Sequence, residues 1–281
     1  MNSKIFKYAV ISMFAVTLFV GQVSASEYIN YFGIEITEEE YDNLINLGFT
    51  PDEIYHMNEE NFEQNKDIES TLEVQNTKYY KTVYTDLSGN SYSTEISKEE
   101  YDNQSKTVTP RATVTTSYKT MTSSLTRNSD NTFRYKVSVS WTNIPSTRSY
   151  DIIGIGFNDE VYISSLVNFV YYYCNTSNEC TTSSAFYDKK KLSTGGSAVY
   201  KVPSGSLAAL TASLYYDVSK NTTATLTGLS MYGDYAHATT NVTPTLYTEH
   251  TVNNSGLQLY SSIISKYDAI PYAQSSWIGT W

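Results

Sequence analysis

The sequence predicts a mainly β protein, in which a small helical module and a hairpin precede a C-terminal antiparallel β-sandwich. Threonine and tyrosine, which favour a pleated and half-buried surface, are abundant, and 27 of the 281 residues are tyrosine. Apolar and polar residues alternate from Phe133 to Trp141, which indicates a half-buried antiparallel strand. Further short apolar runs, separated by turn residues, follow towards the C-terminus, as is typical of sandwich and Greek-key folds.

Residues 1–25 have the three parts of a secretory signal peptide. Two lysines make the start positive, residues 9–21 are apolar apart from two hydroxyl side chains, and small residues end the segment. The apolar run is shorter than the roughly 20 residues of a membrane-spanning helix, so we expect cleavage after Ala25. The expected product is a secreted, extracellular chain with no integral membrane segment.

Charge divides the rest of the chain into two parts. Residues 26–106 hold 19 acidic and 5 basic residues, a net charge of −14, whereas residues 107–281 hold 10 and 12, a net charge of +2. Neither part has a concentrated basic face, so no nucleic-acid partner is expected. The run Lys189-Lys190-Lys191 is interpreted as a solvated loop. The contrast in charge predicts units with different surfaces.

Residues 26–70 are predicted to form a short acidic helical module. Thr37 and Glu40 make a capping box that begins one helix, and Gly48 ends it. Thr50, followed by a proline and by a glutamate three residues on, begins a second helix, and a third short turn follows. The thin core expected for this module consists of Leu44, Leu47, Phe49, Ile54, Met57 and Phe62.

The residues of this module carry two resemblances. The stretch 47–50 (LGFT) before a capped helix is similar to the loop of ubiquitin-associated domains. We interpret this similarity as a shared way of packing the loop, and we infer no ubiquitin binding from it. The longer segment 41–67 (YDNLINLGFTPDEIYHMNEENFEQNKD) resembles the leader region of uncharacterised secreted Gram-positive bacterial proteins, which continue into a Ser/Thr/Tyr-rich β-domain. That resemblance implies the same order of parts here, and it implies no activity.

Residues 71–111 are predicted to contain a hairpin, a short helix and a linker. Asp86, Ser88 and Asn90 lie in the hairpin turn and could begin a calcium loop, but Ser97 stands where the bidentate carboxylate belongs. We therefore interpret the segment as a turn.

The linker contains Pro110 and Arg111, and it sets a domain boundary after which residues 112–281 are expected to fold alone. Two other arrangements stay open. The acidic part could be a pro-segment removed near Arg111, or the hairpin could complete the sheet of the sandwich.

Several segments of the domain 112–281 are expected to be strands. Ile152–Phe157 is continuously apolar, which suits a strand buried on both faces. Leu207, Leu210 and Leu214 could instead lie on a short helix. The other expected strands are Val114–Arg127, Leu166–Cys174, Ala198–Val202, Leu210–Val218, Thr223–Leu229 and Leu257–Ile264.

The two cysteines, Cys174 and Cys180, are expected to form a disulfide that closes a hairpin loop. Such a small loop recovers little chain entropy, so the bond would fix the hairpin more than the whole fold. No further metal ligand stands near them in the sequence, so neither a metal nor a cofactor is expected.

No catalytic motif is present in the sequence, because it has neither a Gly-x-Ser-x-Gly elbow nor a His-Glu-x-x-His helix. Asp234 and His237 make the most suggestive pair, since an aspartate can orient an imidazole for base catalysis. No nucleophile accompanies them, and His56 and His250 stand alone. A hydrolase built from distant carboxylates is a third hypothesis. Its candidate residues are Asp151, Asp159, Glu160, Asp217 and Asp234.

Dense tyrosines, Tyr171 to Tyr173 and Tyr215-Tyr216, offer apolar rings with polar tips for sugar or peptide recognition. The favoured hypothesis is therefore a secreted, non-enzymatic binding protein whose partner is a glycan, the cell wall or a protein. The alternative is a secreted pore-forming or membrane-active toxin, because residues 113–127 alternate mildly and could rearrange into a transmembrane hairpin.

Overall fold

The computed structural model describes residues 28–84, 91–103, 115–158, 160–270 and 272–281. The expected signal peptide, the candidate calcium residues Asp86, Ser88 and Asn90, and the linker residues Pro110 and Arg111 lie outside the described residues. Strands make up 53% of the described residues and helices 15%, so the predicted mainly β class is confirmed. None of the helices in the described ranges has the length and apolar character needed to cross a membrane.

Two antiparallel sheets form the sandwich. The strands of the first sheet are β3 (Ser70–Tyr84), β4 (Ser91–Ile96), β5 (Thr115–Asn128), β6 (Phe133–Trp141), β8 (Val161–Ile163), β9 (Asn168–Asn175), β10 (Cys180–Ser183) and β13 (Leu207–Lys220). The strands of the second are β7 (Tyr150–Phe157), β11 (Asp188–Leu192), β12 (Gly195–Lys201), β14 (Gly228–Ala238), β17 (Tyr267–Ala269) and β18 (Ala273–Ile278). The first sheet runs β10-β9-β13-β6-β5-β3-β4 with β8 beside β13, and the second runs β11-β12-β7-β14-β17 with β18 beside β14.

Strand β6 shows how the layers are built. Its apolar face, which includes Phe133, Tyr135 and Val137, is buried in the main core between the two sheets, as the alternation predicts. Its polar face is buried as well, and Arg134 and Lys136 are only 3% and 1% exposed. The prediction of a half-buried strand is therefore wrong for this face, because the helical module covers it.

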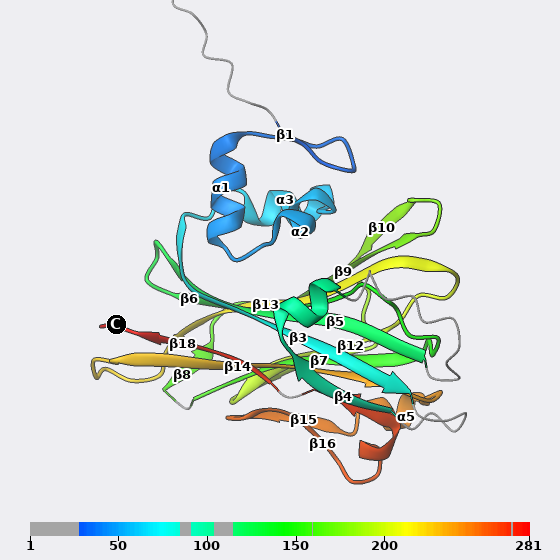
Figure 1. Cartoon of the computed structure of the whole chain (residues 1–281). Coiled ribbons are helices and arrows are strands. Elements are labelled where there is room, and N and C mark those ends of the chain that lie inside the picture. The colour runs from blue at the N-terminus through cyan, green and yellow to red at the C-terminus, as the bar shows by residue number, and fades with distance from the viewer. Residues whose placement is uncertain (1–27, 85–90, 104–114, 159, 271) are drawn as a thin grey trace, which may run out of the picture.

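The module consists of β1 (Tyr28–Ile29), β2 (Glu35–Ile36), α1 (Glu38–Asn46), α2 (Pro51–Tyr55) and α3 (Glu59–Asn65), and it lies over the outer face of the first sheet (Figure 1). Capping boxes begin α1 at Thr37 and α2 at Thr50, as predicted. All six residues of the predicted thin core are buried there, and Tyr215 of the sheet joins them. At Gly48, with φ +84°, a Cβ would lie 2.2 Å from Ser124 Oγ, so glycine permits both the turn and the close approach.

Polar contacts fix the module on the sheet. Lys136 Nζ lies 2.7 Å from Glu53 Oε2 and donates a hydrogen bond to the Gly48 carbonyl oxygen at 3.1 Å. Arg134 Nη1 donates to Asn65 Oδ1 at 2.7 Å, and its Nε donates to Asp217 Oδ1 at 2.9 Å. The acidic module is thus joined to basic residues that the sheet holds away from water.

The outer face of the second sheet is covered too. The cover comprises α5 (Pro244–Tyr247), the hairpin β15 (His250–Asn253) and β16 (Gly256–Leu259), and a 3-10 turn at Ile264–Lys266. Figure 1 shows these elements on the side of the sandwich away from the helices. Ile152 and Ala236 from the sheet pack there with Tyr247 and Ile263. Ile152–Phe157 is therefore buried on both faces, as predicted.

The hairpin β3–β4 belongs to the first sheet. β3 pairs with β5 from Ser70 opposite Asn128 to Tyr84 opposite Thr115, and with β4 on its other side. A short helix, α4 (Lys98–Asn103), follows. The sequence left open whether the hairpin completes the sheet of the sandwich, and in the structure it does. The boundary predicted near residue 110 therefore does not separate two sheets, because β3 and β4 before it and β5 after it belong to the same sheet. The toxin alternative depends on the segment 113–127, most of which forms β5. This strand is an inner strand of the sheet, between β3 and β6.

Some predicted elements differ from the structure. The run Lys189-Lys190-Lys191 is not a loop but part of the edge strand β11. Leu207, Leu210 and Leu214 lie on strand β13 and not on a helix. The strand expected at Thr223–Leu229 begins only at Gly228 and continues to Ala238, and the one expected at Leu257–Ile264 ends at Leu259. In each case the pairing with neighbouring strands decides where the strand lies and where it ends, and the local residue pattern does not specify that pairing.

Candidate functional site

The suggestive aspartate–histidine pair exists, but with a different aspartate. His237 Nδ1 lies 2.9 Å from Asp151 Oδ2, and the Tyr235 hydroxyl donates to the same carboxylate. Asp151 and His237 are both 0% exposed, and His237 Nε2 is buried without a hydrogen-bond partner among the described residues. A polymer substrate could not reach this pair, so it serves to join β7 to β14 inside the sandwich.

Asp234 lies on the other face of β14, because residues three apart on a strand point to opposite sides. Its Oδ2 accepts a hydrogen bond from the Leu257 backbone N–H at 2.6 Å, beneath the hairpin β15–β16. Burial raises the pKa of Asp234 to about 8. A Cβ on Gly256, whose φ is +103°, would come within 1.7 Å of this carboxylate, so the turn requires glycine.

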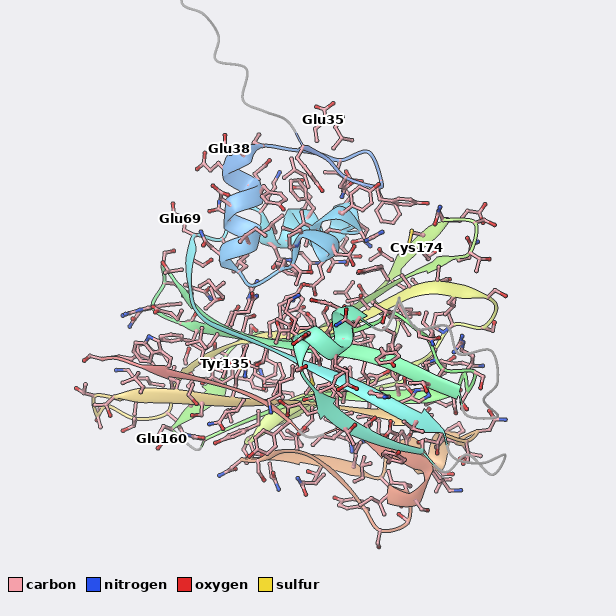
Figure 2. All side chains as sticks on the ribbon, viewed as in Figure 1. Glu35, Glu38, Glu69, Tyr135, Glu160 and Cys174 are labelled. Carbon is pink, nitrogen blue, oxygen red and sulfur yellow. A yellow bond between two sulfur atoms is a disulfide. The ribbon has the colours of Figure 1, made fainter. Side chains whose placement is uncertain are left out.

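The remaining candidate carboxylates occupy separate surroundings. Asp217 pairs with Arg134 near the helical module, Glu160 is exposed, and Asp159 lies outside the described residues. Figure 2 shows Glu160 at the periphery, away from the module. No two of the four described candidates share a hydrogen-bond partner within the part of the chain that the structure describes. The structure does not assemble them into a glycosidase-type pair.

The predicted disulfide between Cys174 and Cys180 is present and joins two residues that pair directly across β9 and β10. No further ligand stands near them in the sequence, but the fold brings His56 Nε2 to 3.6 Å from Cys174 Sγ. The third histidine is elsewhere, since His250 Nε2 lies 2.9 Å from Ser197 Oγ under the second sheet. Burial and the nearby Lys190 lower the pKa of His250 to about 4.

An open groove of about 370 Å³ lies where the β10–β11 connection crosses between the sheets. Tyr171 and Tyr173 pack against the main core and are half-buried, so part of each ring reaches the surface in this groove. The residues that line the groove are Tyr171, Tyr173, Ala185, Tyr187, Lys201, Val202, Pro203 and Ser204.

The groove presents aromatic rings with polar groups. Tyr171 packs against the buried Tyr200 at 5.2 Å, and the nearly parallel ring of Tyr173 lies 6.3 Å farther along the same strand face. Neither the Tyr171 nor the Tyr173 hydroxyl has a hydrogen-bond partner among the residues that the structure describes. Tyr187 is 55% exposed on the other side, and Lys201 brings a positive charge. The groove therefore offers apolar surface, hydroxyl groups and a cation to a ligand.

Only part of this groove is predictable from the sequence. The dense run Tyr171 to Tyr173 draws attention to β9, and the structure buries Tyr172 while its two neighbours face the groove. The other tyrosine pair, Tyr215-Tyr216, is buried in two different cores. Tyr187 and Lys201 have no local signal, since they meet β9 only through the crossing between sheets.

Comparison with known proteins finds no matching family model and no matching curated protein. Among solved structures, the collagen-binding domain of the surface protein RspB from Erysipelothrix rhusiopathiae is similar over 59% of this chain and 66% of that chain, with 9% identity and a TM-score of 0.28. AvmM, which catalyses macrocyclization in alchivemycin A biosynthesis, is similar over 52% of this chain and 79% of its own, with 10% identity and a TM-score of 0.22. This chain thus spans slightly less than two thirds of the RspB domain. Both likenesses are too distant to carry an argument about function.

Proposed function

We propose that this protein is a secreted, non-enzymatic binding protein that holds an extracellular glycan in the aromatic groove between β9 and β12. The observation that carries the proposal is that the half-buried Tyr171 and Tyr173 and the exposed Tyr187 line one open depression. Their rings can pack on the C–H faces of sugars, and their hydroxyls can exchange hydrogen bonds with sugar hydroxyls.

The surroundings of the groove favour a chain over a small molecule. Its sides belong to two different sheets, and it is open at the edge of the sandwich, so a polymer could pass through it. Lys201, which lines the groove, favours a glycan with acidic groups. The Asp151–His237 pair is buried, which argues against catalysis at that place.

The proposal is tested by binding of the purified protein to an array of neutral and acidic glycans with immobilised peptidoglycan and collagen beside it. We expect retention on at least one glycan, and a loss of about 30-fold for Tyr187→Ala, the size expected when a central aromatic contact worth about 2 kcal/mol is removed. Retention on collagen alone, or no loss in Tyr187→Ala, would overturn the proposal.

A further inference from the structure

A second constellation, on the opposite side of the β9–β10 hairpin from the groove, suggests a metal site. His56, Cys174 and Cys180 each present a ligand atom, and these three atoms all lie within 4.8 Å of one another. They come from two parts of the chain, since His56 follows α2 while both cysteines belong to the hairpin. Figure 2 shows Cys174 on this hairpin beside the helical module.

The imidazole of His56 is held in the orientation of a metal ligand. Its Nδ1 lies 2.9 Å from the Asp52 carbonyl oxygen, to which it can only donate, so Nε2 keeps its lone pair and faces the sulfur. Metal-bound histidines are typically oriented by such a hydrogen bond from the second nitrogen. The ring also stacks on Tyr172 at 4.3 Å and 14°, and the Tyr172 hydroxyl donates to Asp52. The ring is therefore fixed from two directions.

The spacing fits tetrahedral zinc. With zinc–sulfur and zinc–nitrogen bonds of about 2.3 and 2.05 Å, the nitrogen–sulfur edge of a tetrahedron is about 3.6 Å. His56 Nε2 and Cys174 Sγ are already 3.6 Å apart. The two sulfurs, bonded to each other in this structure, would have to separate to about 3.8 Å, which rotation of the side chains of two directly paired residues can provide. The half-exposed Cys180 leaves a fourth position to water.

We propose that reduction of the Cys174–Cys180 disulfide creates a Zn²⁺ site with His56 Nε2 and the two thiolates as ligands. A dithiol reductant breaks the sulfur–sulfur bond, supplies two electrons and two protons, and is itself oxidised to a disulfide. Zinc binding then releases both thiol protons and forms two zinc–sulfur bonds and one zinc–nitrogen bond. The oxidised chain offers no thiolate, so the site opens and closes with the redox state. We expect the hairpin to stay next to the helical module in both states, because the Cys180 N–H donates to the Tyr31 hydroxyl at 2.9 Å and the Thr182 hydroxyl donates to the His56 carbonyl oxygen at 2.6 Å, and neither contact involves sulfur.

The test uses the purified full chain, reduced with a phosphine that is then removed without oxygen, and Co²⁺ as the probe. We expect one equivalent of Co²⁺ to give the visible bands of a tetrahedral site and a thiolate charge-transfer band, and one equivalent of Zn²⁺ to bleach both. The oxidised chain is the matched control and should give neither. Circular dichroism of each sample confirms that it is folded.

His56→Gln separates a three-ligand site from a simple pair of thiols. Loss of a direct ligand should weaken Co²⁺ binding at least about ten-fold, since even loss of an orienting partner costs that much. Cys180→Ser should leave no more charge-transfer intensity than a single thiolate gives, because only Cys174 remains. A reduced chain that binds Co²⁺ no better than the oxidised one, or a His56→Gln variant with unchanged affinity and spectrum, would overturn the proposal.

Discussion

The buried ion pair between Lys136 and Glu53 should be a main attachment of the helical module. Lys136 is 1% exposed, and Glu53 Oε1 also accepts hydrogen bonds from Ser138 and Ser213. Burial by itself would raise the pKa of Glu53, but the Lys136 charge and these hydrogen bonds hold it below its usual value. Lys136→Met keeps the length of the side chain and leaves the carboxylate without its cation.

Removing one member of a buried pair costs about 3–5 kcal/mol, because the other charge stays buried and uncompensated. For a chain of this size, that loss corresponds to a fall in Tm of about 6–20 °C. Urea unfolding followed by circular dichroism measures the free energy, with a thermal scan beside it. Lys136→Met with Glu53→Gln should recover part of the loss, since the double variant buries no charge.

Lys78→Met is the matched control, because Lys78 pairs with Glu95 at 2.9 Å on the surface of the same sheet. A surface pair contributes less than about 1 kcal/mol, so this variant should unfold close to the wild type. If Lys136→Met unfolds with the same free energy as Lys78→Met, the module is not held on the sheet through a buried charge, and the reasoning is refuted.

Three further predictions follow from the fold and its buried groups. The folded chain keeps the Asp234 proton up to about pH 8, whereas the unfolded chain releases it near pH 4. The free energy of unfolding of the wild type should therefore fall, relative to that of Asp234→Asn, by up to about 1.4 kcal/mol per pH unit between these values. Parallel curves of unfolding free energy against pH for the two proteins would contradict this. Residues 112–281 expressed alone should aggregate, since β5 loses β3; a cooperative transition near that of the full chain would disprove it. Mass spectrometry of the secreted chain should find Ser26 first, and an intact Met1 species in the membrane would exclude the signal peptide.

Features that depend on neighbouring residues were predictable from the sequence. The capping boxes at Thr37 and Thr50 and the disulfide between Cys174 and Cys180 each involve residues at most six positions apart, and all three are present. The alternation in β6 likewise predicts the residues that face the sandwich core, because side-chain direction in a strand is a local property.

Features that depend on distant pairing were not predictable. The polar side chains of β6 look like a solvent face until the module covers them, and nothing local indicates that Lys136 meets Glu53, 83 residues away. Asp234 and His237 look like partners in the sequence, but their side chains lie on opposite faces of the same strand. The carboxylate that contacts His237 belongs instead to Asp151 of β7. His56 is 118 residues from Cys174, so the sequence shows a pair of cysteines where the fold holds three ligand atoms.

Calorimetric titration with the glycan that the array retains most strongly tests the aromatic groove most directly. Wild type is compared with the double variant Tyr173→Ser/Tyr187→Ser and with Tyr92→Ser, an exposed tyrosine on β4 at the opposite edge of the first sheet. We predict a Kd at least about 30-fold higher in the double variant and unchanged in Tyr92→Ser, because only the groove contacts the ligand. Equal Kd values for all three proteins, or release of new reducing ends from the glycan, would contradict a non-enzymatic binding site in this groove.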